Sequence, residues 1–190
     1  QVAALTTAQV NALVADTQFA ALTSTQLNAM TTAQVAKLTT DQVVAMTTLQ
    51  AANLGTTQAA ALTTAAIAAM DVADVTAMNT AAVAAMSTDQ IRALTTTEDG
   101  QIVGLTTAQV AGLKTAQVAA LTADQLKVLS TNQVVALSTA QAASLSTSLS
   151  TLQGLGMVVN QAVIGIKYWT GADVDAKDLN DELLRVLGLA

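Results

Sequence analysis

Residues 31–46 read TTAQVAKLTTDQVVAM, one eight-residue pattern written twice. The same pattern, here called the octad, runs from the first residue to Leu145. Its large apolar residue returns every eight positions, with a spacing of nine before Leu22 and of eleven before Leu105. Internal repetition of this kind decides the architecture before length or composition does.

An eight-residue period fits neither one long helix nor a strand. An α-helix turns by about 100° per residue, so a stripe that repeats every eight residues winds around the helix and cannot keep facing one partner. Segments such as QVAAL, residues 1–5, show no alternation of polar and apolar residues and are rich in helix formers. The octad therefore excludes a long coiled coil and a long strand.

The residue after each Leu or Met predicts where a helix begins. That position holds mostly residues favoured at a helix N-cap, where a side-chain oxygen accepts a hydrogen bond from a free backbone N–H. In most octads a Gln follows three residues later, as in a capping box, where its side chain reaches back to the N-cap N–H. Lys114 is an exception; the N-cap candidates are Thr6, Thr23, Thr31, Thr39, Thr47, Gly55, Thr63, Asp71, Asn79, Ser87, Thr106, Thr122, Ser130 and Ser138.

Each octad is thus a helix start, and the next start ends the helix after about one and a half turns. The Leu before the cap and the apolar residue four positions after it, such as Leu38 and Val43, form a hydrophobic staple. Isolated helices under ~12 residues are marginal, so neighbouring repeats must stabilise one another. We predict an all-α solenoid of short capped helices built from eight-residue repeats, whose handedness and repeats per turn do not follow from the pattern.

Two kinds of interruption fit this interpretation. In TTTEDGQIVGL, residues 95–105, the extra residues centre on Glu98-Asp99-Gly100, which predicts an outward loop before Ile102 and Leu105 resume the axis. Elsewhere Ala66, Asp74 and Ala82 replace the Gln, which weakens the capping box and leaves the cap residue in place.

The composition changes after Leu145, which divides the chain into residues 1–145, the octapeptide-repeat α-solenoid, and residues 146–190, a helical C-terminal capping segment. Within the second part, residues 176–187 form an amphipathic pattern that stops at Gly188. The alternative to a cap is a module for docking another protein. The pair Tyr168 and Trp169, with Lys167, predicts aromatic packing in the cap or, alternatively, a membrane-interface anchor.

Composition excludes several classes of function. With no His and no Cys, the common nucleophile–base pairs and imidazole or thiolate metal sites are absent. The net charge is −6 and the basic residues lie singly, so nucleic acid is not a predicted partner. The longest apolar run, residues 155–166, is shorter than the ~20 residues of a bilayer span, so no membrane-spanning helix is predicted.

Acidic residues are the remaining candidates for chemistry. Asp71 and Asp74 share a helix face and could hold a cation, but they fill the cap and Gln positions, which favours a structural role. Glu98 and Asp99 in the predicted loop are expected to be solvated. We therefore predict no catalytic residues, no cofactor, no metal site and no enzymatic activity.

The octads resemble the Leu-Thr-Thr-x-Gln-Val-x-Ala arrays of very long, repetitive bacterial proteins that are usually regarded as secreted or surface-associated. The resemblance covers residues 1–145 and implies an adhesin-like extracellular or surface protein, with no catalytic residues to carry over. Because QVAAL begins in mid-octad, we expect the chain to be a piece of a longer array whose neighbouring repeats are its partners. Residues 174–188 look like the helical half of a dockerin or EF-hand-like unit, but Lys167 and Gly171 stand where its calcium loop needs carboxylates.

Every recurrent position of the octad has a folding role, so the expected function is a non-enzymatic structural spacer or scaffold. The alternative is a binding module. If the corners stack, the threonines form hydroxylated rows of the kind that bind ice or carbohydrate, although Asp71, Asn79 and Ser87 interrupt them. The acidic loop at residues 98–100 and docking through the C-terminal segment are further candidates; the predicted rows contain Thr31, Thr39 and Thr47 with Thr32, Thr40 and Thr48.

Overall fold

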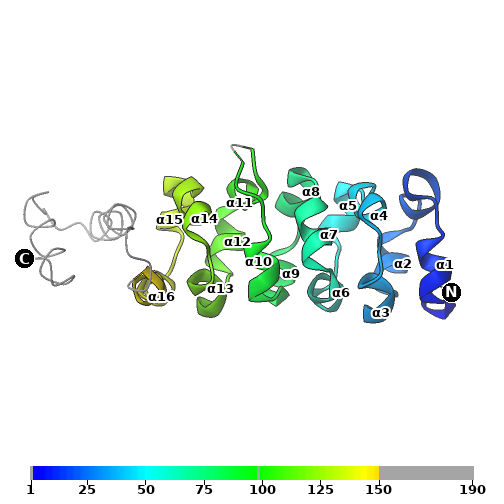
Figure 1. The fold of residues 1–190 in the computed structure, drawn as a ribbon, viewed down its shortest axis with the longest axis horizontal. Helices are drawn as coiled ribbons and strands as arrows, with labels where there is room; N and C mark the ends of the chain where they lie inside the picture. The colour runs from blue at the N-terminus through cyan, green and yellow to red at the C-terminus, as the bar shows by residue number, and fades with distance from the viewer. Residues whose placement is uncertain (1, 98, 150–190) are drawn as a thin grey trace, which may run out of the picture.

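The computed structural model describes residues 2–97 and 99–149, and all the regular structure within them is helical. The helices form an elongated array with α1 near one end and α16 at the other (Figure 1). The prediction of an all-α solenoid of short helices is confirmed. The elements are η1 (Val2–Ala4), α1 (Thr7–Asn11), η2 (Ala15–Phe19), α2 (Ser24–Asn28), α3 (Thr32–Val35), α4 (Thr40–Val44), α5 (Thr48–Ala52), α6 (Thr56–Ala61), α7 (Thr64–Ala69), α8 (Val72–Ala77), α9 (Thr80–Ala85), α10 (Thr88–Arg92), α11 (Gln101–Gly104), α12 (Thr107–Ala111), α13 (Thr115–Ala119), α14 (Ala123–Val128), α15 (Thr131–Val135) and α16 (Thr139–Leu149).

Most helices begin at the predicted cap. In α4, Thr39 has an extended backbone (φ −74°, ψ 159°), and its Oγ1 accepts from the N–H of Gln42 at 3.2 Å. In return, Oε1 of Gln42 accepts from the N–H of Thr39 at 3.1 Å, which completes the capping box. The extended backbone at the next cap ends the helix, so the chain turns a corner in every octad.

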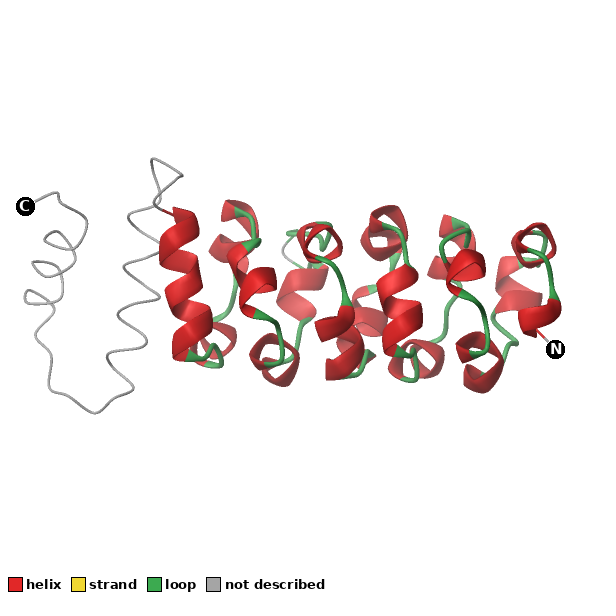
Figure 2. Cartoon of the chain, turned by 90° about the horizontal axis from the view of Figure 1, so that it is seen from below, coloured by secondary structure: helices red, strands yellow, loops and turns green. Residues whose placement is uncertain are grey.

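Each helix packs against the helix three elements earlier, so the solenoid has three rows of stacked helices (Figure 2). The chain changes row at each corner and returns to its first row after three helices, which we call one coil. Three octads therefore build one coil. The rows are α1, α3, α6, α9, α12 and α15; η2, α4, α7, α10, α13 and α16; and α2, α5, α8, α11 and α14.

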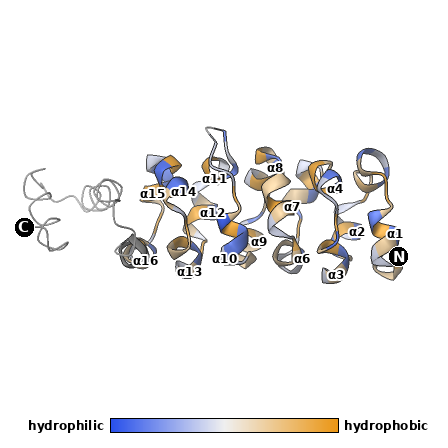
Figure 3. Ribbon diagram, viewed as in Figure 1, coloured by the Kyte–Doolittle hydropathy of each residue, from blue (hydrophilic) through white to orange (hydrophobic). Residues whose placement is uncertain are grey.

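The core runs along the axis between the three rows. It is filled by the apolar residue four positions after each cap, such as Val43, Ile67 and Ile91, all fully buried, and by the Leu or Met that ends each octad. Hydrophobic residues recur in every repeat along the array in Figure 3. The core is a continuous column, and each repeat contributes the same two layers to it.

The nine-residue spacing before Leu22 is absorbed by a π-helix. In η2 the N–H of Phe19 bonds to the carbonyl of Val14 and that of Ala20 to the carbonyl of Ala15, five residues apart instead of four. One extra residue thus fits into the turn. Phe19 is fully buried and occupies the core position that an aliphatic residue fills in other repeats.

The eleven-residue spacing before Leu105 is absorbed by a loop, as predicted. Thr95 and Gln101 form a capping box across six positions instead of three, with N–H···O distances of 3.1 and 3.0 Å. Gly100 lies inside the loop, where an added Cβ would come within 2.6 Å of the Thr95 carbonyl. Ile102 and Leu105 return to the buried axis.

At the C-terminal end, α16 continues through Leu145 to Leu149. The predicted capping segment beyond it, with Lys167, Tyr168 and Trp169, lies outside the described residues. In the part of the chain that the structure describes, no helix is long and apolar enough to cross a membrane.

Candidate functional site

The most regular polar feature of the solenoid is a set of buried glutamines that recurs near the start of most helices in all three rows, here called the glutamine ladder. Each turns Nε2 toward backbone carbonyls of the repeat four octads earlier, and all except Gln58 also use Oε1 for their own capping box; at Gln58 the N-cap N–H, that of Gly55, donates to Oδ1 of Asn28 instead. Gln109, for example, donates to the carbonyls of Val75 at 2.9 Å and Met78 at 2.8 Å. The ladder consists of Gln34, Gln42, Gln50, Gln58, Gln90, Gln101, Gln109, Gln117, Gln125, Gln133 and Gln141.

An amide suits this position because it carries both an acceptor and two donors. The acceptor closes the capping box, and the donors bond to carbonyls at the end of a helix one coil below, where helix geometry leaves carbonyls short of intrahelical partners. Gln117 makes the same link although its N-cap residue is Lys114. Its Oε1 accepts a hydrogen bond from the Lys114 N–H at 2.7 Å. The inter-coil bond is thus independent of the cap side chain.

Sequence reasoning assigned these glutamines to the capping box alone and missed the bonds between coils. A signal was present in the sequence. Glu serves a capping box as well as Gln does, yet no octad has Glu at this position. The consistent choice of Gln over Glu indicates that the N–H donors of the amide are used.

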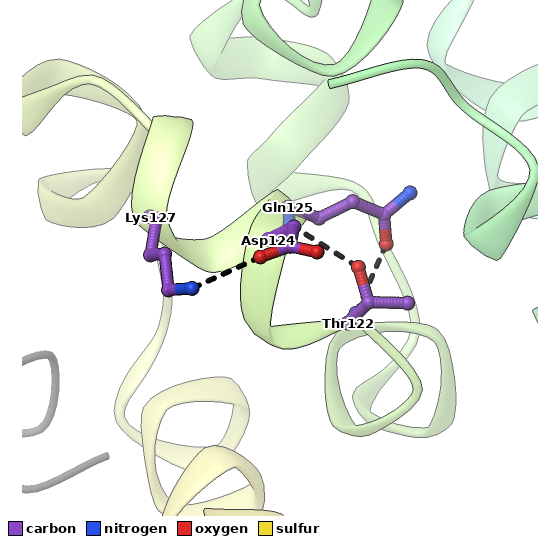
Figure 4. Close-up of polar contacts among 4 residues, drawn as sticks. All are labelled: Thr122, Asp124, Gln125 and Lys127. Atoms are coloured by element: carbon purple, nitrogen blue, oxygen red, sulfur yellow. Dashed lines mark hydrogen bonds and ion pairs between the residues drawn. The ribbon is translucent and has the colours of Figure 1, made fainter. Parts of the chain in front are cut away.

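Figure 4 shows the capping box of one ladder glutamine, Gln125, with its surface neighbours. The N–H of Gln125 donates to Oγ1 of Thr122, and Oε1 of Gln125 accepts from the N–H of Thr122 at 3.0 Å. Beside it, Nζ of Lys127 contacts Asp124 at 3.0 Å with both side chains largely exposed. Exposed pairs of this kind contribute little to stability, so the array is held by neutral contacts.

The ladder begins only where a coil lies beneath it. Gln9, Gln18 and Gln26 belong to the first coil and are exposed. Each accepts through Oε1 from a backbone N–H at the start of its own helix. None of the three donates through Nε2 to a described residue. They therefore separate the local role of the glutamine from its role between coils.

One coil in the middle of the array, α7 to α9, lacks the glutamines, and we call it the glutamine-free coil. Ala66, Asp74 and Ala82 occupy the positions and are buried. Asn79 replaces one link, because its Oδ1 caps α9 at the N–H of Ala82 while its Nδ2 donates to the carbonyl of Leu54 at 2.8 Å. In this coil the side-chain amide of Asn79 therefore supplies part of the bonding that glutamines supply elsewhere.

The acidic pair predicted from the sequence lies at the start of α8, and its two members differ. Asp71 is exposed at the N-cap, but its side chain makes no capping hydrogen bond, contrary to the prediction for this position. Asp74 is 3% exposed, and its Oδ2 has no hydrogen-bond partner. Burial raises the pKa of Asp74, an interaction with the Thr48 side chain lowers it, and the charge of Asp71 raises it further.

The threonine rows are not arranged as predicted. Thr32, Thr40 and Thr48 follow one another in sequence but fall in three different rows, because each corner moves the chain to the next row. Threonines align every third octad instead. The first position of each helix is Thr throughout one row, and all are exposed: Thr7, Thr32, Thr56, Thr80, Thr107 and Thr131.

The other sequence candidates lie apart from the ladder. Asp99 is exposed in the loop before α11, and Glu98 is outside the described residues. Within residues 2–97 and 99–149, no three Asp or Glu side chains are grouped so that they could hold a metal ion.

Comparison with known proteins gives one family. The family model described as the ALTTAQ repeat matches residues 17–48, 67–98 and 98–131, which together are just over half of the chain. The six letters of its name stand unchanged at residues 4–9. No curated protein and no solved structure matches the chain.

Proposed function

Because the chain belongs to the ALTTAQ repeat family, we propose that it is a non-enzymatic structural spacer whose length is set by the number of octads. The observation that carries this proposal is the short and constant distance along the chain between repeats that contact one another. The larger helix–helix contacts join helices three elements apart, and each glutamine reaches only the repeat four octads back. A rod with contacts of this range can be lengthened without redesigning a core.

The composition of the octad supports the same function. Its cap, glutamine, core residues and small residues are all used in folding, and the varied positions between them are exposed. The resemblance to arrays of secreted or surface-associated bacterial proteins favours an adhesin-like extracellular or cell-surface location. There the array would hold another part of its parent protein away from the cell.

The test is to change length by whole coils. Residues 114–137 contain α13 to α15 with their caps and three ladder glutamines. A variant that carries a second copy of this segment after residue 137 should keep the helical circular dichroism per residue. Small-angle X-ray scattering should show a longer particle of unchanged cross-section. A particle that grows in all dimensions would contradict the spacer.

A matched variant deletes the eight residues Thr31 to Leu38. This deletion removes one octad, which is one third of a coil. Each helix after the deletion therefore moves to a different one of the three rows relative to the helices before it. We expect a shorter rod that keeps its function as a spacer. If a specific ligand activity disappeared while the particle merely shortened, the array would be a binding module.

The aligned threonines favour one second candidate, a surface that binds ice or a carbohydrate. The test replaces Thr80 and Thr107 by Lys in the unbroken row and measures inhibition of ice recrystallisation and binding to a carbohydrate array. Leu49→Lys is the control, since Leu49 is 69% exposed on the row that Val72 and Ala123 interrupt. Activity in the parent that only the threonine variant loses would support this candidate, and no activity in the parent would remove it.

A further inference from the structure

The glutamine-free coil contains the one buried polar side-chain atom without a hydrogen-bond partner among the described residues, Oδ2 of Asp74. The other two residues at glutamine positions in this coil, Ala66 and Ala82, are apolar and need no polar partner. Asn79 supplies a donor to the coil below for α9. Asp74 supplies none, since an ionised carboxylate accepts hydrogen bonds but cannot donate them.

The register of the ladder identifies what faces Asp74. Gln90 donates to the carbonyls 31 and 28 residues earlier, those of Ala59 and Leu62. The equivalent carbonyls for position 74 belong to Val43 and Met46, at the end of α4. Thr48, at the start of the next helix, interacts with the Asp74 side chain, which agrees with this register.

Position 74 therefore brings together acceptors without the donor that the ladder provides elsewhere. An ionised Asp74 adds negative charge to a site that already contains carbonyl oxygens, and a buried unpaired charge is costly. A protonated Asp74 has one O–H, which is the missing donor. The two protonation states thus have opposite effects on the contact between this coil and the one before it.

Few other charges act on this site. The two helices that pack on α8 are α5 and α11, and neither contains an acidic or basic residue. Asp71, at the N-cap of α8, is the charged group that acts on Asp74, and its negative charge also favours the protonated form. Thr48 is the polar group that α5 contributes.

We propose that Asp74 is a proton-binding site that makes the joint between α5 and α8 dependent on pH. When a solvent proton binds the carboxylate, the new O–H donates to a carbonyl at the end of α4 and closes the joint. When the proton leaves, the buried charge repels the carbonyl oxygens at the end of α4, just before α5 begins, and α8 loosens from α5. The rod then has one weak coil in its middle once the pH exceeds the folded-state pKa of Asp74.

The direction in which folding stability changes with pH follows from the linkage between proton binding and folding. The folded chain raises the pKa of Asp74 above its value in the unfolded chain, so folding favours the protonated form. The stabilising contribution is complete below the unfolded pKa and is lost as the pH rises through the folded pKa. This direction is opposite to that of a carboxylate held in an ion pair.

The experiment compares the full chain with Asp74→Asn, which keeps a donor of similar size but does not titrate, and with the exposed control Asp41→Asn. Denaturant unfolding is measured from about pH 4 to pH 7. The unfolding equilibrium constant of the parent, divided by that of Asp74→Asn, should rise by up to about tenfold per pH unit, which is the limit for one proton. Asp41→Asn should follow the parent.

Hydrogen exchange gives a local measurement that global unfolding cannot. After correction for the intrinsic rate, amide protection in α5 and α8 should fall toward pH 7 in the parent and stay constant in Asp74→Asn. A flat difference between the parent and Asp74→Asn in both measurements would overturn the proposal. Stabilisation of the parent, but not of Asp74→Asn, by NaCl or CaCl2 at pH 7 would also overturn it, because the bound ligand would then be a metal cation.

Discussion

Nε2 of Gln109 donates to the carbonyl of Met78, 31 residues earlier, at 2.8 Å, while Oε1 of the same side chain accepts from the N–H of Thr106 at 2.7 Å. One side chain thus fixes the start of its own helix and the end of a helix in the coil below. Local structure and stacking therefore depend on the same atoms, which explains how helices of about five residues hold their shape.

Gln109→Ala should destabilise the solenoid by about 2–3 kcal/mol, because it removes the donor to the Met78 carbonyl and leaves the Val75 carbonyl with only the N–H of Met78. Gln9→Ala is the control, since Gln9 makes the capping box but no link between coils. Its cost should stay below about 1 kcal/mol. Denaturant unfolding of both variants measures the difference, and equal costs would show that the capping box is the main contribution.

Gln109→Glu keeps the acceptor of the capping box and removes the donors. At neutral pH this variant should be less stable than Gln109→Ala, because a buried carboxylate faces two carbonyls. Acid should restore part of the loss as the new carboxyl group becomes protonated. Melting temperatures at about pH 4 and pH 7 test this, and a variant with no pH dependence beyond that of the parent would contradict it.

Asn79→Asp separates the two roles of Asn79. The carboxylate can still cap α9 through the N–H of Ala82, but it cannot donate to the Leu54 carbonyl. We expect a loss of about 1–2 kcal/mol, the cost of leaving a buried acceptor unpaired. Thr63→Asp is the control at a cap without an inter-coil bond and should change stability by less than about 0.5 kcal/mol. Similar losses in the two variants would show that the Asn79 link contributes nothing.

Gly104→Ala should weaken the contact between α11 and α8. A Cβ at Gly104 would lie 2.5 Å from Cγ1 of Val72 and 3.0 Å from Oγ1 of Thr76, which must then move. The expected cost is about 1–2 kcal/mol. Gly112→Ala is the matched control, since its nearest atom would be the Ala108 carbonyl at 3.2 Å and its backbone is already helical. It should be neutral or stabilising by up to about 1 kcal/mol.

Deletion of residues 96–98 should leave the solenoid folded. The deletion places Gln101 three residues after Thr95, which is the spacing of the other capping boxes. Since Ile102 and Leu105 already occupy the buried axis, the coils on either side need not move. Circular dichroism and the unfolding midpoint should match or exceed those of the parent, whereas loss of helicity would show that the loop is needed to start α11.

The sequence predicted the elements of the fold well because those elements are encoded locally. A cap residue, a Gln three positions later and an apolar residue at the next position define each helix start, and the structure confirms this at Thr39 and Gln42. The outward loop before Ile102 followed from the same register. These predictions required only knowledge of residues close in sequence.

What the sequence did not predict depends on how many octads make one coil. That number follows from the angle at each corner, which no single octad encodes, so the alternative in which stacked corners align Thr32, Thr40 and Thr48 did not foresee that they lie in three rows. The bonds of the ladder were missed for the same reason, since a partner about 30 residues away is identified only once the coil is known. Asp74 was interpreted as a weakened capping box, and its burial without a donor required the packing of α8.

The glutamine ladder also gives the rod a direction. Every Nε2 donor points toward the N-terminal end and every accepting carbonyl faces the C-terminal end, so the two ends of the array differ chemically. The donor face of one coil meets the acceptor face of another only when the two coils point the same way. Any end-to-end assembly of these arrays through the ladder therefore produces a polar filament, in which all subunits share one orientation.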